Sequence, residues 1–448
     1  MEDGTTDASA PGAPVPGTSA LDTSTTDVRA DVRAWLERHW DPDLSVDDWW
    51  RLVAEAGWTA PSLPCEQGGR GLHRSANHLV RSTFREFGAL RPPGGLGLLI
   101  AAPTILAHGT SEQIGRLVPP ILEGRVNWCQ LFSEPGAGSD LAGLTTRAEQ
   151  DGDRWVVNGQ KVWSSMARTS DYGMLLARTD LSVPKHRGIS WFAFPLDQPG
   201  VTVRPLREMT GEAVFNEVFL DDAICDGDDL IGGEGKGWSV TQTSLYFERA
   251  GIGAGGGHAG FPEPGPKGGM LGRRAGEAVL DPEPGGNMLV TVADLISLAK
   301  AHRRTGVASI RHDLARLYAY TQIGRWNALR GKAEAVRGGG QNVANLGKLS
   351  QTRIVKLAAQ LSLDLLGADG MLAAPDGPDG GRYSGFMVFS PASSIYGGTD
   401  EIQHNIIAER SLGLPRDEVP GRTLPYGEVL RAMVGRDEPN PSSAPPRS

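Results

Sequence analysis

The feature that most constrains this chain is a loop of small residues at 132–143, which reads F-S-E-P-G-A-G-S-D-L-A-G. Glycines and a proline surround Ser139 and Asp140. Glycine allows tight turns and lets backbone N–H groups approach a ligand closely. We interpret the loop as a candidate ligand-binding segment. Its acids, Glu134 and Asp140, are of a type that caps turns through side-chain-to-backbone hydrogen bonds.

The residues that follow the loop have the period of a β-strand. Trp155 and Val157 alternate with Arg154 and Val156, and Asn158-Gly159 comes next. Asn-Gly between β-prone runs is a strong signal for a hairpin turn, because both residues tolerate a positive φ. The pattern therefore predicts a hairpin that returns the chain to Trp163-Ser164-Ser165.

Helical and strand periodicities occupy separate blocks of the chain. Apolar spacing predicts helices over residues 27–127 and again over 233–416, with short strands between, over 128–232. Segregated blocks favour an α+β multidomain protein with an N-terminal helical domain, a middle β barrel or sandwich, and a C-terminal helical region. The candidate strands are Thr145–Glu149, Arg154–Lys161, Tyr172–Arg178, Ile189–Pro195, Val201–Pro205 and Asn216–Leu220.

Three segments lack such periodicity. Residues 1–26 and 417–448 are predicted to be tails, the first of them disordered. Residues 251–288 form a Gly/Pro-rich insertion in the C-terminal helical region. We interpret the insertion as a flexible surface loop, and the alternative is a lid or a partner contact.

Composition excludes several classes of protein. The net charge of −9 argues against a nucleic-acid partner, which would select a basic surface. The three cysteines are odd in number and widely spaced, which argues against a disulfide framework and favours the cytoplasm. No Cys/His spacing typical of a metal site is found, and no apolar run reaches the roughly 18 residues of a membrane span.

A second motif, Y-G-G-T-D-E-I-Q at 396–403, lies near the C-terminus. With the 132–165 stretch it resembles the two signatures of the acyl-CoA dehydrogenase family, and the similarity covers roughly residues 27–415. The resemblance implies three domains, the last a four-helix bundle, with FAD held between them. It also implies an acyl-CoA substrate, an electron-transfer flavoprotein as electron acceptor, and a role such as fatty acid β-oxidation.

The resemblance also implies which residues bind the cofactor. A hydroxyl or backbone N–H can hydrogen-bond a flavin ring, and an indole can cover it. Trp163 has a simpler alternative as a core aromatic at the end of a strand. The implied cofactor-binding residues are Phe132, Ser133, Gly138, Ser139, Trp163, Ser165, Thr399 and Glu401.

The resemblance places the general base on the helix that follows the β domain. Many relatives carry a glutamate after the signature tyrosine, but here that position is Gly397, which cannot accept a proton. A minority of relatives carry Glu-Arg on the earlier helix, as Glu248-Arg249 does here. We therefore expect Glu248 to be the base, with the Gly397 N–H polarising the thioester carbonyl. Ser139, Arg249 and Tyr396 are expected to contact the substrate.

Both residues of the Glu-Arg pair have ordinary alternatives. Glu248 can be a solvated helix acid, and Arg249 can be an ion-pair partner. Gly397, together with Asp364 where relatives have glutamine, also raises a second hypothesis, a non-catalytic subunit of a heteromeric dehydrogenase. A third is an oxygen-using acyl-CoA oxidase or flavin monooxygenase. The resemblance favours a homodimer or homotetramer, with a heterotetramer as the alternative.

Overall fold

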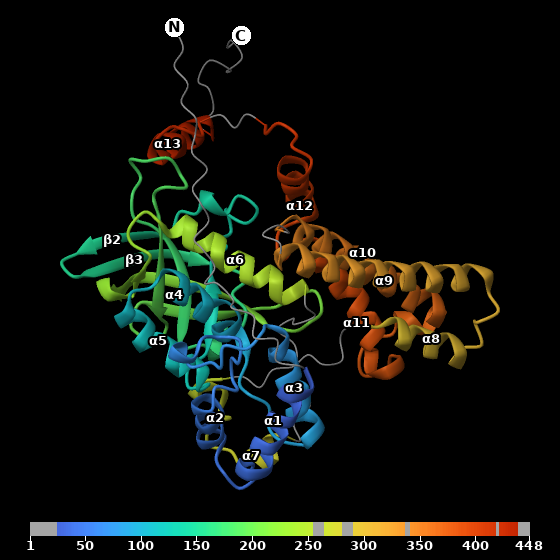
Figure 1. Cartoon of the computed structure of the whole chain (residues 1–448). Coiled ribbons are helices and arrows are strands. Elements are labelled where there is room, and N and C mark those ends of the chain that lie inside the picture. Colours follow the sequence, from blue (N-terminus) through green and yellow to red (C-terminus); the bar gives the residue numbers. More distant parts are fainter. Residues whose placement is uncertain (1–24, 254–263, 280–289, 337–340, 418–420, 438–448) are drawn as a thin grey trace, which may run out of the picture.

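The computed structural model describes residues 25–253, 264–279, 290–336, 341–417 and 421–437. Within these ranges, N-terminal helices, a middle sheet and C-terminal helices follow one another along the chain, as the sequence predicts (Figure 1). The predictions for residues 1–24, 418–420 and 438–448, and for 254–263 and 280–288 of the insertion, fall outside the described residues.

Aromatic side chains dominate the core of the N-terminal helices. Trp49, Trp50, Trp58 and Phe84 are almost completely buried there. Ser45 caps the second of these helices, since its side chain accepts a hydrogen bond from the Asp48 N–H. The helices are α1 (Thr25–His39), α2 (Val46–Glu55), α3 (Ser75–Phe87), the π-helical turn Gly97–Ala101, α4 (Ala102–His108) and α5 (Ser111–Leu122).

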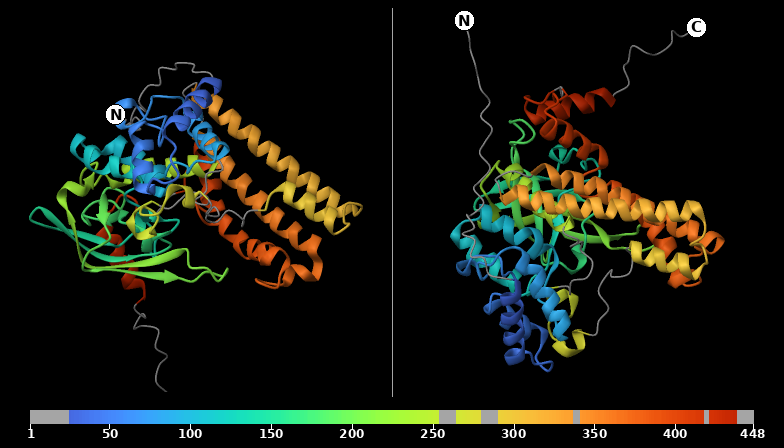
Figure 2. Two further views of the ribbon diagram at one scale, coloured as in Figure 1. Left: turned by 90° about the horizontal axis from the view of Figure 1, so that it is seen from below. Right: turned by 45° about the vertical axis from the view of Figure 1, so that its right-hand side comes forward.

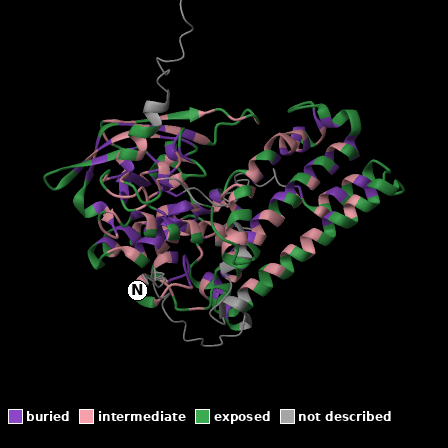
Figure 3. Ribbon diagram, turned by 90° about the horizontal axis from the view of Figure 1, so that it is seen from above, coloured by how far each residue is buried: buried purple, intermediate pink, exposed green. Residues whose placement is uncertain are grey.

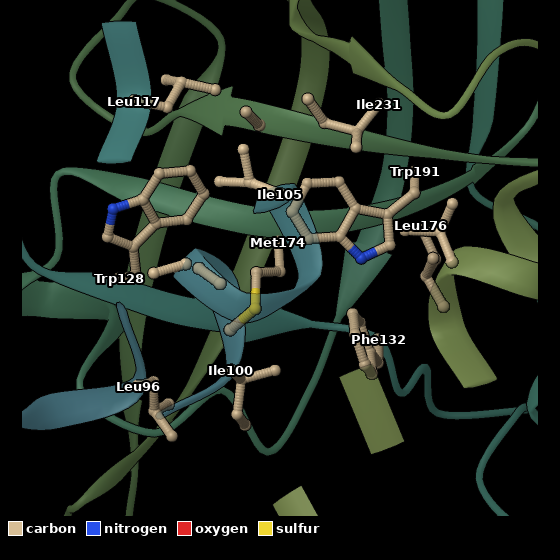
Figure 4. Close-up of a cluster of buried hydrophobic side chains, with 14 of the residues drawn as sticks. Leu96, Ile100, Ile105, Leu117, Trp128, Phe132, Met174, Leu176, Trp191 and Ile231 are labelled. Carbon is tan, nitrogen blue, oxygen red and sulfur yellow. The ribbon is translucent and has the colours of Figure 1, made fainter. Parts of the chain in front are cut away.

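The middle region is a curved sheet with a hydrophobic core on each face. Along β4, Met174 and Leu176 point into one core and Leu175 and Ala177 into the other. Figure 4 shows the first core, where side chains of the sheet meet those of α4 and α5. In the second core, residues of β2, β3 and β7 pack against those of β4 and β5, so the sheet closes over itself.

The strands of this sheet include two that the sequence did not predict, β1 and β8. They are short, and β1 pairs in parallel with β4, about 40 residues later. The order is β6-β7-β3-β2-β4-β5-β8, with β1 beside β4. The bounds are β1 (Trp128–Leu131), β2 (Arg147–Asp151), β3 (Arg154–Lys161), β4 (Tyr172–Arg178), β5 (Ile189–Pro195), β6 (Val201–Leu206), β7 (Phe215–Asp226) and β8 (Leu230–Ile231).

The hairpin turn predicted at Asn158-Gly159 is wrong. Both residues lie inside β3, and the β2–β3 hairpin turns instead at Gly152, which has φ 61°. At Asn158 the pairing of β3 with β7 shifts register, and the Asn158 side chain exchanges two hydrogen bonds of 2.9 Å with Asp222. The extra residue of this β-bulge lies on β7, where Asp221 and Asp222 oppose Asn158 and Asp222 has φ 50°.

The C-terminal region is a bundle of long helices that extends to one side of the sheet (Figure 2). Four helices contribute to the core of the bundle, which includes Leu295, Leu317, Leu365 and Phe386. The outer faces of the long helices are largely exposed (Figure 3). The helices are α6 (Gly237–Gly253), α8 (Val292–Ala301), α9 (Ala308–Val336), α10 (Gln341–Leu366), α11 (Arg382–Phe389) and α12 (Asp400–Ile406).

Part of the predicted flexible insertion is instead packed structure. Residues 264–279 contain α7 (Ala275–Ala278), and Ala275 and Ala278 are buried in the core of the N-terminal helices. The Ala275 N–H donates to Leu44 O at 2.8 Å. The sequence missed this because the anchoring residues are small alanines with no recognisable period.

Part of the predicted C-terminal tail is also ordered. Helix α13 (Tyr426–Asp437) lies apart from the bundle (Figure 1), and its first residues hydrogen-bond the segment after β4. Tyr426 is 4% exposed. The apolar residues Tyr426, Val429, Leu430 and Met433 recur at helical spacing, a signal that the tail prediction overlooked.

Candidate active site

The loop of small residues begins where β1 ends and makes a tight turn. The Glu134 and Ala137 backbones exchange hydrogen bonds of 3.0 and 3.1 Å. A Cβ built on Gly138 would meet no atom within 4 Å, and Ser139 is exposed. The glycine therefore leaves free space over the backbone of this loop.

A buried ion pair anchors the loop to β3. Lys161, which is fully buried, donates to Glu134 Oε1 at 2.8 Å and to Phe132 O at 3.1 Å. Glu134 also accepts from the N–H groups of Thr145 and Thr146 at 2.7 and 2.9 Å. Burial opposes the charged carboxylate, but Lys161 and these donors outweigh it and hold the pKa of Glu134 at about 2. Glu134 thus caps the loop as expected, with an ionic partner that the sequence analysis missed.

The end of β3 places Trp163 beside the loop. The Val162 N–H donates to Ser133 O at 2.9 Å, which brings Phe132 and Ser133 next to Trp163 and Ser165. Trp163 is 57% exposed, so it is not the core aromatic of the alternative reading. Its φ of 61° lies in the left-handed region, which costs a tryptophan of the order of 1–3 kcal/mol and is typical of functional sites.

Glu248 lies on α6 beside β1. Gln130 of β1 donates to its Oε2 at 3.1 Å, and Gln130 is only two residues before Phe132. Two hydrogen bonds seat α6 on α4, between Thr104 and Ser244 at 3.1 Å and between His108 and Thr243 at 2.8 Å. Burial raises the pKa of Glu248, while the Gln130 hydrogen bond and the Arg249 charge oppose that rise. The structure therefore places this carboxylate among protein groups next to the loop, and not in bulk water.

Arg249 follows Glu248 on α6 and is half-buried. Its pKa is lowered chiefly by burial and also by the positive charge of Arg410, while Glu248 raises it.

The second motif forms the start of α12 on the bundle. The Thr399 side chain accepts from the Ile402 N–H, and Glu401 is exposed in the first turn. Asp400 binds Lys348 at 2.7 Å. Gly397 has φ 66°, so a side chain here would be strained. In the described part of the chain, no hydrogen bond or ion pair links Glu248 to Tyr396 or Gly397.

The structure thus brings the expected site residues together in two groups. The first combines the loop, the end of β3 and Glu248, and the second is the start of α12. The sequence analysis missed Gln130 and Lys161. Lys161 carried a signal, because it shares the inward face of β3 with Trp155 and Val157, where a charge needs a buried partner. Gln130 carried none, since its partner is 118 residues away.

The described residues contain no cluster of three or more His, Cys, Asp or Glu side chains arranged to hold a metal ion. None of their helices combines the length and the apolar character that crossing a membrane requires. Cys65 is exposed and Cys129 and Cys225 are buried, and all three are free thiols.

The chain belongs to the acyl-CoA dehydrogenase family, a class of FAD-dependent oxidoreductases. The family models for the N-terminal, middle and C-terminal domains match residues 20–125, 129–223 and 286–412. Members of the family are FAD-dependent flavoproteins, and this chain is an oxidoreductase of that kind.

Similar proteins include the acyl-CoA dehydrogenase IpdE1 of Mycobacterium tuberculosis, 39% identical over 82% of this chain and 88% of the relative. IpdE1 of Mycolicibacterium smegmatis is 34% identical over 87% of this chain and 97% of the relative. A solved structure named Tcur3481-Tcur3483 steroid ACAD has a TM-score of 0.67 and 26% identity, covering 88% of this chain and 98% of that one. The ChsE4-ChsE5 complex from Mycobacterium tuberculosis has a TM-score of 0.64 and 26% identity, covering 89% of this chain and 100% of that one.

The residues around the loop fit a flavin. Trp163 offers an exposed indole face, and Gly138 offers open space beside the backbone. The buried Ser164 Oγ lacks a hydrogen-bond partner. An aromatic face, uncovered backbone and hydroxyl groups match the ring edge and ribityl chain of FAD.

Proposed function

We propose that this chain removes two hydrogens from the α and β carbons of an acyl-CoA thioester, giving the 2,3-enoyl-CoA and passing electrons to an electron-transfer flavoprotein. The observation that carries the proposal is Glu248, a partly buried carboxylate held 3.1 Å from Gln130 beside the loop. Bound FAD supplies the acceptor for the hydride that leaves the β carbon.

In this proposal the chain's own residues divide the work. Glu248 accepts the α proton on a carboxylate oxygen, and its raised pKa improves the match to a weak carbon acid. The Gly397 N–H polarises the thioester carbonyl, and Ser139, Arg249 and Tyr396 contact the substrate. Phe132, Ser133, Gly138, Ser139, Trp163 and Ser165 hold the flavin ring and ribityl chain, and Thr399 and Glu401 contact the adenosine end.

The test is an anaerobic titration of the purified flavoprotein with a panel of acyl-CoAs. The panel includes straight-chain and steroid-type acyl groups, because one similar structure is named a steroid ACAD. A substrate bleaches the flavin absorbance at about 450 nm. Glu248→Gln abolishes the bleaching but retains the flavin. Glu149→Gln, which changes an exposed acid on β2, is the matched control. Full bleaching by Glu248→Gln would remove the residue from the mechanism.

A second candidate function is that of one subunit in a heteromeric dehydrogenase, completed by an unlike chain. It is favoured by Gly397 and by an exposed apolar stripe on α9, formed by Ile323, Trp326 and Leu329 at 45–62% exposure. Some similar structures carry the names of two chains. Light scattering of the chain, alone and with an unlike dehydrogenase chain, distinguishes the hypotheses. A stable homo-oligomer that turns over acyl-CoA excludes the second.

A further inference from the structure

The strongest feature outside the two motifs is the contact between α13 and the loop of small residues. Three successive carbonyls, of Ala142, Gly143 and Leu144, each accept a side-chain hydrogen bond. Arg178 donates to Ala142 O at 2.7 Å and to Leu144 O at 3.1 Å. The Tyr426 hydroxyl donates to Gly143 O at 2.7 Å. We name this arrangement the carbonyl clamp.

The two side chains of the clamp also support each other. The Arg178 guanidinium lies over the Tyr426 ring, 4.0 Å from its centroid, and both residues are buried. This geometry is a cation–π contact, which gains strength when it is desolvated. Arg178 also donates to Lys185 O at 2.9 Å, which ties the loop to the segment after β4.

The backbone at the start of α13 is fixed to that same segment. The Tyr426 N–H donates to Val183 O and the Gly427 N–H donates to Leu181 O, both at 2.9 Å. Tyr426 is therefore held from its backbone as well as its side chain. The match to the C-terminal family model ends at residue 412, before this helix begins.

We propose that α13 pre-organises the loop of small residues from its Gly143 side, with Tyr426 as a positioning residue for FAD binding. This inference rests on the proposed role of residues 132–143 in holding the flavin. A loop that is ordered before the ligand arrives spares the ligand the cost of ordering it. Tyr426 touches the loop on the Gly143 side, while Gly138 and Ser139 remain open.

The experiment compares full-length wild type with Tyr426→Phe, which keeps the ring over Arg178 and removes only the hydroxyl. Tyr426→Ala, which removes both contacts, is the stronger variant. Tyr318→Phe is the matched control, because Tyr318 is 56% exposed on α9 in the bundle. Two quantities are measured on apoprotein, the FAD dissociation constant by fluorescence quenching and amide hydrogen exchange in residues 140–146.

For Tyr426→Phe we expect the FAD dissociation constant to rise about three- to tenfold, the range of one lost hydrogen bond. Exchange at Gly143 and Leu144, whose N–H groups close turns on Asp140 O and Leu141 O, becomes faster. The control changes neither quantity. An unchanged dissociation constant in both Tyr426 variants overturns the proposal, even if exchange accelerates. Wild type that binds no FAD would overturn the proposed function itself, and so the two failures are distinguishable.

Discussion

Replacing Lys161 by methionine tests the ion pair that anchors the loop of small residues. The change removes the ammonium 2.8 Å from Glu134 Oε1 and leaves a carboxylate that is 7% exposed. Removing one partner of a buried pair costs about 3–5 kcal/mol, because the other charge is left uncompensated. The pKa of Glu134 agrees in direction, since Lys161 and the Thr145 and Thr146 donors lower it from 4.5 to about 2 against the effect of burial.

The free energy to measure is that of opening the middle sheet, from native-state hydrogen exchange of amides in β3 and β4. Local opening energies avoid treating a multidomain chain as two-state. The FAD concentration is held fixed, because a ligand that binds only native protein adds apparent stability. We expect Lys161→Met to lower this free energy by about 3 kcal/mol.

The matched control is Lys185→Met in the same loop region. Lys185 binds Asp140 at 2.7 Å, but the Asp140 side chain is 66% exposed. An exposed pair contributes about 1 kcal/mol or less. The double variant Lys161→Met with Glu134→Gln removes both buried charges and recovers at least about 1 kcal/mol relative to Lys161→Met alone. If Lys161→Met and Lys185→Met lowered the free energy of opening equally, the argument that burial makes the Lys161–Glu134 pair important would be refuted.

Two further predictions concern titration. Gln130→Leu removes the donor that favours ionised Glu248, so the acid limb of the plot of kcat against pH moves up by about half to one pH unit. The control Gln160→Leu loses a similar hydrogen bond to Glu217 and leaves the acid limb in place. An acid limb that stays or moves down in Gln130→Leu contradicts the assignment of Glu248 as the base. The pKa of Glu134 is depressed in the folded protein, so ionised Glu134 contributes to folding stability above pH 4.5, and this contribution disappears as the pH falls towards about 2. Between pH 5 and 2.5, unfolding measurements should show wild type losing more stability than Glu134→Gln, and parallel pH curves would contradict this.

Sequence reasoning succeeded where information is local. The bounds of β3, β4 and β5 were predicted to the residue, because the alternation at the start of β3 and the short apolar runs of β4 and β5 are visible within a few positions. The turn predicted at Asn158-Gly159 failed because these residues continue β3 opposite a bulge on β7, and only the partner strand reveals that arrangement.

The candidate site was predicted as a set of motifs, and its chemistry depends on contacts that no motif contains. Glu248 was identified by resemblance, but Gln130, which tunes its pKa, lies on a strand 118 residues earlier. Tyr426 is 283 residues from Gly143. Periodicity identifies which face of an element is buried, whereas it cannot identify the distant atom that satisfies a buried polar group.

The position of α7 has a consequence for how the chain is made. The core of the N-terminal helices includes Ala275 and Ala278, although α3 ends at Phe87. A ribosome adding 5–20 residues per second needs roughly 10–40 s to proceed from Phe87 to Ala275. During that interval the aromatic cluster around Trp49 lacks the α7 residues that complete its packing. The first part of the protein to be synthesised is therefore among the last to be completed, after the whole sheet has left the ribosome.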